Sequence, residues 1–180
     1  MVDGVRAMNE TLFWKILSLL DWNKAGDDDA VLRPALDALA ALGEADISEF
    51  ADLLAEKLRA LDTREVARAV YAGRADPDNG NDYISADDFL YSRCVGVANG
   101  RAFFEKVLAD PRNIPTDMEF EALLELPAQA YEQKTGKTFD RKPRVSFESF
   151  SNAEGWKPTA RTRPGKFTGP DVPPSNRRPS

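Results

Sequence analysis

The stretch from Ser85 to Gly100, SADDFLYSRCVGVANG, holds the side chains of this sequence that are best suited to chemistry. Asp87 and Asp88 form a carboxylate pair of the kind used in acid–base catalysis, and Arg93 follows them at helical spacing. The same residues also have structural uses. Acids stabilise a helix N-terminus, and an interior arginine fixes helix register by pairing with an acid from a neighbouring helix. The structural interpretation needs no further group and is preferred.

Composition excludes the commonest catalytic and metal centres. The 180 residues include one cysteine and no histidine. A Ser-His-Asp triad needs an imidazole, a structural zinc site needs several thiolate or imidazole ligands, and a disulfide within the chain needs a second thiol. Cys94 is expected to be a small buried apolar residue rather than a nucleophile. We therefore expect no catalytic residue, no metal and no cofactor.

The segment between Gly73 and Ser85 is rich in side-chain oxygens but does not fit a calcium loop. With Asp76 as the first position of an EF-hand, the sixth position is Asn81 instead of glycine, and the twelfth is Asp87 instead of glutamate. Its Asp, Asn, Gly and Pro content is typical of a connecting loop. Asp82 and Asp87 are therefore candidates for contact with a partner rather than for metal binding.

Helix signals surround these residues. Ser85 and Asp88 are spaced as a capping box, and Asn99-Gly100 is a helix stop. Capping boxes are also expected at Asp46–Glu49, Asp62–Glu65 and Thr116–Glu119, with an N-cap at Asn9. Pro34 predicts a helix start near Arg33 or a kink, and Pro127 predicts an interruption. No alternating strand pattern is convincing, so the sequence predicts an all-α bundle of seven or eight short helices.

The central stretch resembles the signature of a bacterial domain-of-unknown-function family, numbered forty-two forty, in which a segment close to S-D-D-x-F-x-x-F-R-x-W-L-I-x-x-G follows a helix. Ala86, Ser92 and Val95 depart from it. Phe13-Trp14 and residues 130–136 resemble the start and end of the family, so the resemblance spans about residues 9 to 139. It implies a small helical cytoplasmic protein and no established activity. The matching positions are Ser85, Asp87, Phe89, Arg93, Val97 and Gly100.

Charge divides the chain into an acidic body and a basic tail. Residues 1–140 carry 15 Lys and Arg against 27 Asp and Glu, whereas residues 141–180 carry 9 against 3. We expect a disordered leader over 1–8, a helical domain over 9–139, and a proline-rich tail over 140–180 that is extended or mobile unless it lies on the acidic body or a partner. The tail is the only plausible nucleic-acid contact, through Arg141, Arg144, Trp156, Arg161 and Arg163.

The sequence has no apolar run of membrane-spanning length and no apolar segment near its N-terminus, so a cytoplasmic protein without a membrane span is expected. Trp14 is expected to pack in the core, or else to be an exposed anchor for another chain. Oligomeric state stays open.

The leading hypothesis is a non-enzymatic helical interaction protein whose acidic surface docks a basic partner protein through Asp82, Asp87, Arg93 and Trp14. The alternative is a carboxylate-based enzyme, with or without a divalent metal, with its site near residues 85–93. It predicts a concave pocket there with two or more convergent acids. A nucleic-acid accessory protein acting through the tail is a weaker third hypothesis.

Overall fold

A computed structural model describes residues 7–71 and 85–157, and in these ranges the chain is all-α, as predicted. No strand occurs in this part of the chain. The seven α-helices and three short 3-10 helices (η) are, in chain order, α1 (Glu10–Leu17), η1 (Trp22–Lys24), α2 (Asp28–Ala40), α3 (Glu44–Ala60), α4 (Arg64–Val70), α5 (Ala86–Ala98), α6 (Arg101–Ala109), η2 (Pro111–Asn113), η3 (Glu121–Glu125) and α7 (Leu126–Thr135).

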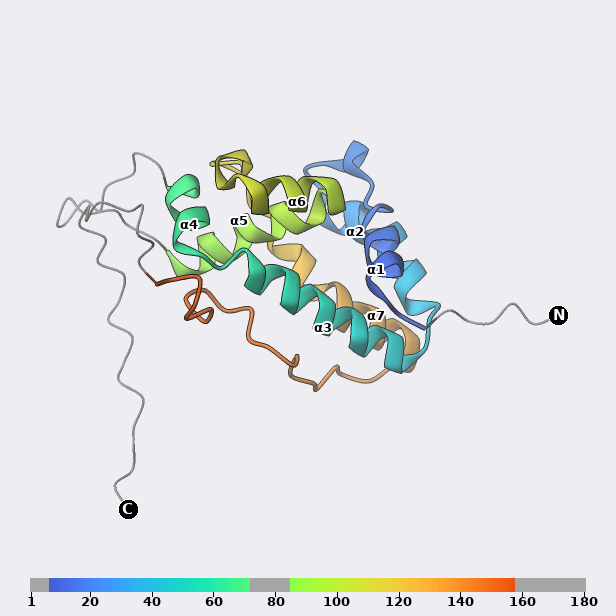
Figure 1. The fold of residues 1–180 in the computed structure, drawn as a ribbon. Coiled ribbons are helices and arrows are strands. Elements are labelled where there is room, and N and C mark those ends of the chain that lie inside the picture. Colours follow the sequence, from blue (N-terminus) through green and yellow to red (C-terminus); the bar gives the residue numbers. More distant parts are fainter. Residues whose placement is uncertain (1–6, 72–84, 158–180) are drawn as a thin grey trace, which may run out of the picture.

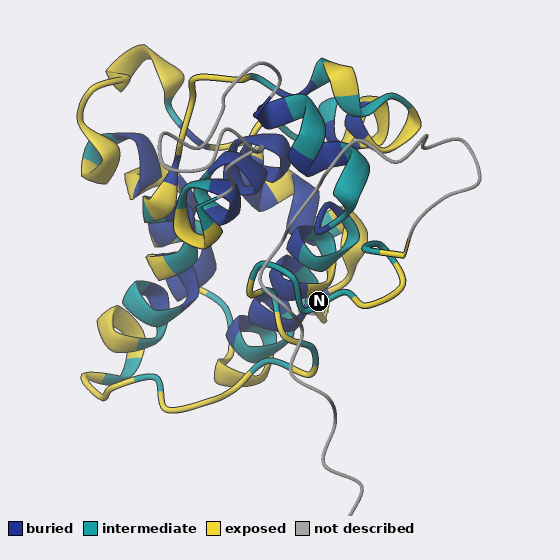
Figure 2. Ribbon diagram, turned by 90° about the vertical axis from the view of Figure 1, so that its left-hand side faces the viewer, coloured by how far each residue is buried: buried dark blue, intermediate teal, exposed yellow. Residues whose placement is uncertain are grey.

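The long helix α3 runs through the bundle and packs against both α5 and α7, while α2 packs on α7 and α6 packs on α5 (Figure 1). Their facing sides hold the core, which Figure 2 shows as buried stripes turned toward one another. Among the described residues, none of the helices is long and apolar enough to cross a membrane. The core includes Phe13, Phe50, Leu58, Phe89 and Leu123, each without exposed surface.

Several helix ends follow the local signals. The Asn9 side chain accepts a hydrogen bond from the Leu12 N–H at 3.0 Å, and Ser85 accepts one from the Asp88 N–H at 3.3 Å. Gly100, after α5, has a φ of 87°, a left-handed conformation that costs glycine little. These caps were predicted because their partners lie within four residues along the chain.

Two of the predicted capping boxes are wrong by one to three residues. The helix α3 already begins at Glu44, so Asp46 is its third residue, and its carboxylate accepts from the N–H groups of Gly43 and Met8 at 3.3 and 2.7 Å. The cap of α4 is Thr63 instead of Asp62. In both cases the carboxylate has a distant partner in addition to, or instead of, the local one.

The helix boundaries expected near two prolines are wrong. Pro34 lies inside α2, which begins at Asp28. Because Pro34 is on the exposed side, its ring needs no room in the core, and water can reach the carbonyl that it leaves unpaired. Residues 116–120 are not helical, and Pro127 lies in the first turn of α7, where a missing N–H costs nothing.

Residues 139–157, which we call the C-terminal strap, lie across the helical body without regular structure (Figure 1). The Arg141 guanidinium donates two hydrogen bonds to the buried Asp52 carboxylate, at 2.6 and 3.0 Å, and the Arg144 N–H donates a third at 2.8 Å. The Arg144 side chain pairs with Glu49 and Glu56 at 2.8 and 3.3 Å. The strap therefore neutralises the acidic side of α3.

A second buried acid holds the far end of the strap. Asp62 has no exposed surface and accepts from the N–H groups of Phe150 and Asn152 and from Trp156 Nε1, each at 2.9 Å. Gly155 lies so close to the chain after α3 that a Cβ there would be 2.7 Å from the Asp62 carbonyl oxygen. At Gly155, the backbone of the strap therefore packs directly against the backbone of the helical body.

Arg93 of α5 lies at the centre of these contacts. It is fully buried and donates to the carbonyl oxygens of Leu58 and Phe147, at 2.9 and 3.0 Å, and to Ser149 Oγ at 2.8 Å. The expected ion pair with an acid of a neighbouring helix is wrong, because neutral oxygens are the hydrogen-bond partners. Burial lowers the pKa of the guanidinium, and the charge of Asp62 opposes that effect.

Arg93→Met should destabilise the fold by about 3–5 kcal/mol, because it keeps the apolar stem but removes the donor of one buried and two part-buried hydrogen bonds. Urea denaturation measures the loss, and limited proteolysis should show faster cleavage within residues 139–157. The matched control is Arg101→Met in the exposed Arg101–Glu105 pair, which should stay within about 0.5 kcal/mol. Equal effects of the two substitutions would contradict the central role of Arg93.

Acid should weaken the attachment of the strap through Asp52. Burial alone would raise the pKa of this carboxyl, but the hydrogen bonds from Arg141 and Arg144 outweigh it and leave the pKa below its usual value. The stability that this carboxylate supplies is therefore present above its unfolded-state pKa, about 3.9, and is lost as pH falls through the folded-state pKa.

At neutral pH, Asp52→Asn should thus lower the free energy of unfolding by about 1–3 kcal/mol. The difference from the wild type should shrink at acid pH, once the pH has fallen through the lowered folded-state pKa of Asp52. Denaturation at neutral and at acid pH checks this, and a difference that does not depend on pH would argue against the ionised anchor.

Candidate functional site

The structure separates the four residues predicted to contact a partner. Asp87 is exposed in the first turn of α5, Arg93 is fully buried, and Asp82 lies outside the described residues. Trp14 is 7% exposed and packs on Phe13 and Phe104 with ring centroids 4.9 and 5.4 Å apart. The three described residues do not form one site, and of these three only Asp87 is presented to solvent.

The tail contacts proposed for nucleic acid are divided in the same way. Arg141 and Arg144 bind acids of α3, and Trp156 donates to Asp62. Arg161 and Arg163 fall outside the described part of the chain. The side chains of Arg141 and Arg144 are therefore directed onto the protein's own body.

The outer side of α5 carries a different group of acids. Tyr91 lies one helical turn after Asp87 and Asp88, and Glu121 of η3 lies beside it. A hydrogen bond with Glu121 and the nearby acidic charges raise the pKa of the Tyr91 hydroxyl. The carboxylates of Glu121, Asp87 and Asp88 therefore lie near the Tyr91 hydroxyl.

The segment that brings these acids together is the irregular run before η3. The Phe120 N–H donates to the Tyr91 carbonyl at 3.2 Å, and the Phe120 ring packs on Trp22 with centroids 5.1 Å apart. Trp22 and Met118 are 41% and 55% exposed. We call this surface the Tyr91 face and define it as Trp22, Asp87, Tyr91, Asp117, Met118, Glu119 and Glu121.

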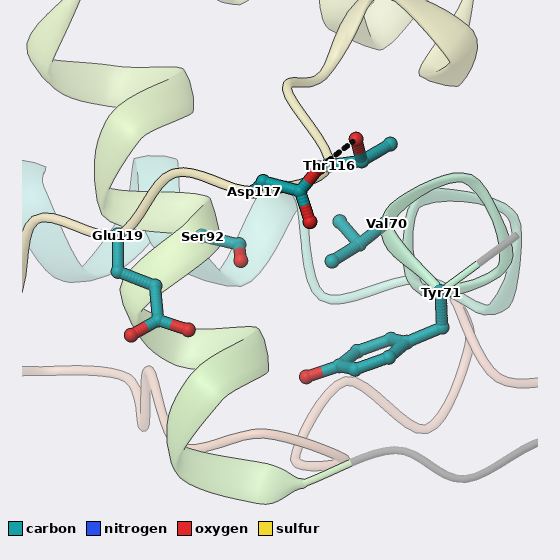
Figure 3. A pocket seen from close by; sticks show the side chains of 6 residues that line it. All are labelled: Val70, Tyr71, Ser92, Thr116, Asp117 and Glu119. Carbon is teal, nitrogen blue, oxygen red and sulfur yellow. Dashed lines mark hydrogen bonds between the residues drawn. The ribbon is translucent and has the colours of Figure 1, made fainter. Parts of the chain in front are cut away.

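A pocket of about 290 Å³ opens between α4, α5 and the same irregular run. Figure 3 shows the side chains of Asp117, Glu119 and Ser92 and the ring of Tyr71 arranged around one space. The remaining lining residues are Val70 and Thr116. Since oxygen atoms come from three elements and both acids are exposed, the pocket offers hydrogen-bond acceptors to a ligand that enters from solvent.

Ser92 is the unusual member of this pocket. Its residue is only 3% exposed and its hydroxyl makes no hydrogen bond within the described ranges, but the oxygen itself is not fully buried and opens onto the pocket. It also occupies one of the positions at which this sequence departs from the family signature, where a phenylalanine is typical. A ring there would extend into the space that Ser92 leaves open (Figure 3).

The acids of the Tyr91 face differ from those of α3 in their pairing. Glu49, Asp52 and Glu56 of α3 all face arginines of the strap. By contrast, Asp87, Glu119 and Glu121 make no ion pair in the parts of the chain that the structure describes. Within the described residues, the chain therefore covers the acids of α3 with its own arginines but does not pair Asp87, Glu119 and Glu121 with a cation.

Sequence reasoning missed most of the Tyr91 face. Residues 116–120 were predicted to begin a helix, which would have spread Asp117, Met118 and Glu119 around its circumference. Trp22 carries no local signal that distinguishes it from Trp14. The available hint was Ser92, a polar residue at an interior position of the central helix.

The described residues contain no group of three or more acidic or cysteine side chains placed to hold a metal ion. In the described ranges, the fold is all-α and carries a group of acids beside Tyr91. A family model described as "Protein of unknown function (DUF4240)" matches residues 8–133, so the chain belongs to this family and the resemblance is confirmed. Searches of curated proteins and of solved structures gave no match.

Trp22 should be the most accessible of the described tryptophans, in a negative environment. Cesium ions should therefore quench its fluorescence more than iodide ions do, because the nearby carboxylates attract cations. The contribution of Trp22 is the difference between the fluorescence quenching of the wild type and that of Trp22→Phe. The preference for cesium should fall in high salt, and equal quenching by both ions at low salt would be inconsistent with the negative environment.

Proposed function

We propose that this chain is a non-enzymatic interaction protein whose Tyr91 face docks a basic partner protein. The observation that carries the proposal is the pairing difference between the two acidic surfaces. The acids Glu49, Asp52 and Glu56 of α3 form ion pairs with arginines of the strap, at N–O distances of 2.6 to 3.3 Å. On the Tyr91 face Asp87, Glu119 and Glu121 have no such cations within the described residues.

The apolar residues of the same face support docking of a protein rather than of a small cation. Trp22 and Met118 are side-chain types enriched at protein interfaces, and both are exposed beside the acids. The acids would attract a basic partner and orient it, and burial of the two apolar side chains would slow its dissociation. A cytoplasmic location belongs to this proposal.

A carboxylate-based enzyme is the second candidate, and one observation favours it. Asp117 and Glu119 line one pocket beside α5, close to the place where the alternative hypothesis predicted convergent acids. A carboxyl group that acts as an acid near neutral pH needs burial or a like charge to raise its pKa. Both side chains are exposed. Their exposure favours binding over acid–base chemistry.

Affinity capture with a charge-reversed face tests the proposal. The wild type and Glu132→Lys, an exposed acid of α7, should retain the same protein from an extract of the source cells at low salt. Glu121→Lys should lose it by at least about tenfold, because a like charge replaces an attractive one. Quantitative mass spectrometry measures retention, and circular dichroism confirms that each variant is folded.

The retained protein should be basic, and its capture should weaken with rising salt. Retention by Glu121→Lys at the wild-type level, or no retained protein at any salt concentration, would count against docking by the Tyr91 face.

A further inference from the structure

We propose that a second pocket, between α3, α7 and the strap, binds a small neutral apolar molecule about the size of one aromatic ring. The pocket has a volume of about 180 Å³. We call it the strap pocket and identify it by Leu54, Ala55, Ala128, Phe139 and Phe147, which are among its lining residues. The proposal goes beyond docking by the Tyr91 face and does not depend on it.

The walls of the strap pocket come from two parts of the chain. Leu54 and Ala55 of α3 are almost fully buried and Ala128 of α7 is half-buried, so one side belongs to the helical body. The half-buried rings of Phe139 and Phe147 belong to the strap, which runs along α3 (Figure 1). The pocket is partly open to solvent, so a ligand can enter while the body stays folded.

The chemistry of the lining favours a ligand without charge. Among the lining residues, all of which lie in the described ranges, Arg141 is the one that carries a charge. Its guanidinium already donates to the Asp52 carboxylate and to the Ser48 carbonyl oxygen, at 2.6 to 3.0 Å. A charged ligand would therefore exchange water for apolar side chains and gain no free partner, which is costly. An apolar ligand has no such cost.

The size of the pocket sets the size of the ligand. An engineered apolar cavity of about 150 Å³ in another protein binds benzene, and the strap pocket is slightly larger. It is smaller than the pockets of drug-sized ligands, which start near about 300 Å³. An unfilled apolar space deprives its lining of dispersion contacts, and a bound ring would restore them. The rings of Phe139 and Phe147 also suit contact with an aromatic ligand.

Binding to the strap pocket must be coupled to docking of the strap. Phe139, Pro143 and Phe147 belong to the strap and line the pocket, and the Arg141–Asp52 ion pair holds the same segment on α3. A ligand would lose one wall if the strap were released. Ligand binding and strap docking therefore favour each other by the same factor.

The test titrates the full chain with benzene and follows the methyl resonances of leucine by NMR. The ring current of bound benzene should shift the methyl resonances of Leu54 and Leu124 saturably and leave those of the exposed Leu19 unchanged. Benzoate keeps the ring but adds a charge, and it should bind at least about tenfold more weakly. The absence of a saturable shift at Leu54 and Leu124 would overturn the proposal. Benzoate that binds as tightly as benzene would overturn the assignment of a neutral ligand.

A filled pocket locates the binding. Ala128→Leu should abolish the shifts without lowering the thermal midpoint, because the larger side chain occupies the pocket from a half-buried position. The matched control, Ala45→Leu, makes the same change at an exposed position of α3 and should keep the affinity within about twofold. If Ala128→Leu is unfolded, nuclear Overhauser contacts between benzene and the methyl groups of Leu54 and Leu124 in the wild type decide, and their absence refutes the site.

Asp52→Asn tests the coupling, because Asp52 holds the strap and is not among the residues that line the pocket. It should weaken benzene binding by at least about fivefold, and benzene should slow proteolysis within residues 139–157 of the wild type. The control Glu132→Gln, which removes an exposed carboxylate of α7, should keep the affinity within about twofold. An unchanged affinity in Asp52→Asn would overturn the coupling between the ligand and the strap.

Discussion

The rest of the structure depends on one buried cation, the guanidinium group of Arg93. Arg93 has no exposed surface, and removing a guanidinium group from water is costly unless its donors are satisfied. Carbonyl oxygens from the end of α3 and from the strap accept hydrogen bonds from Nη1, Ser149 Oγ accepts one from Nη2, and the Phe89 ring lies 4.8 Å away, whereas Nε has no hydrogen-bond partner in the described residues. The strap consequently belongs to the fold rather than to a separate tail, and its arginines cover the acids of α3.

The helices were predictable to the extent that their signals are local. Asn9, Ser85 and Gly100 act within a few residues of their own positions, and the structure uses them as expected. Asp46 and Asp62 carry the same local pattern but also bind N–H groups far away in sequence, at Met8 and at residues 150 and 152. Spacing along the chain cannot distinguish these two uses of an aspartate.

The candidate site was less predictable because its members come from three separate segments. Asp87 was identified from its place in the central helix. Trp14 and Trp22 differ in the side chains that pack on them. The rings of Phe13 and Phe104 and the Lys57 side chain pack on Trp14, whereas the Phe120 ring packs on Trp22. The pocket depends on a small side chain at position 92 and on an irregular run that sequence patterns assigned to a helix.

The folding unit and the family match end at different residues. The match ends at residue 133, but two of the oxygens that surround Arg93 belong to residues 147 and 149, and Trp156 closes over Asp62. A fragment designed from the family boundary would keep the arginine and delete most of its solvation shell. Expression fragments and fusion junctions should therefore be placed after residue 157, where the body retains its full set of acceptors.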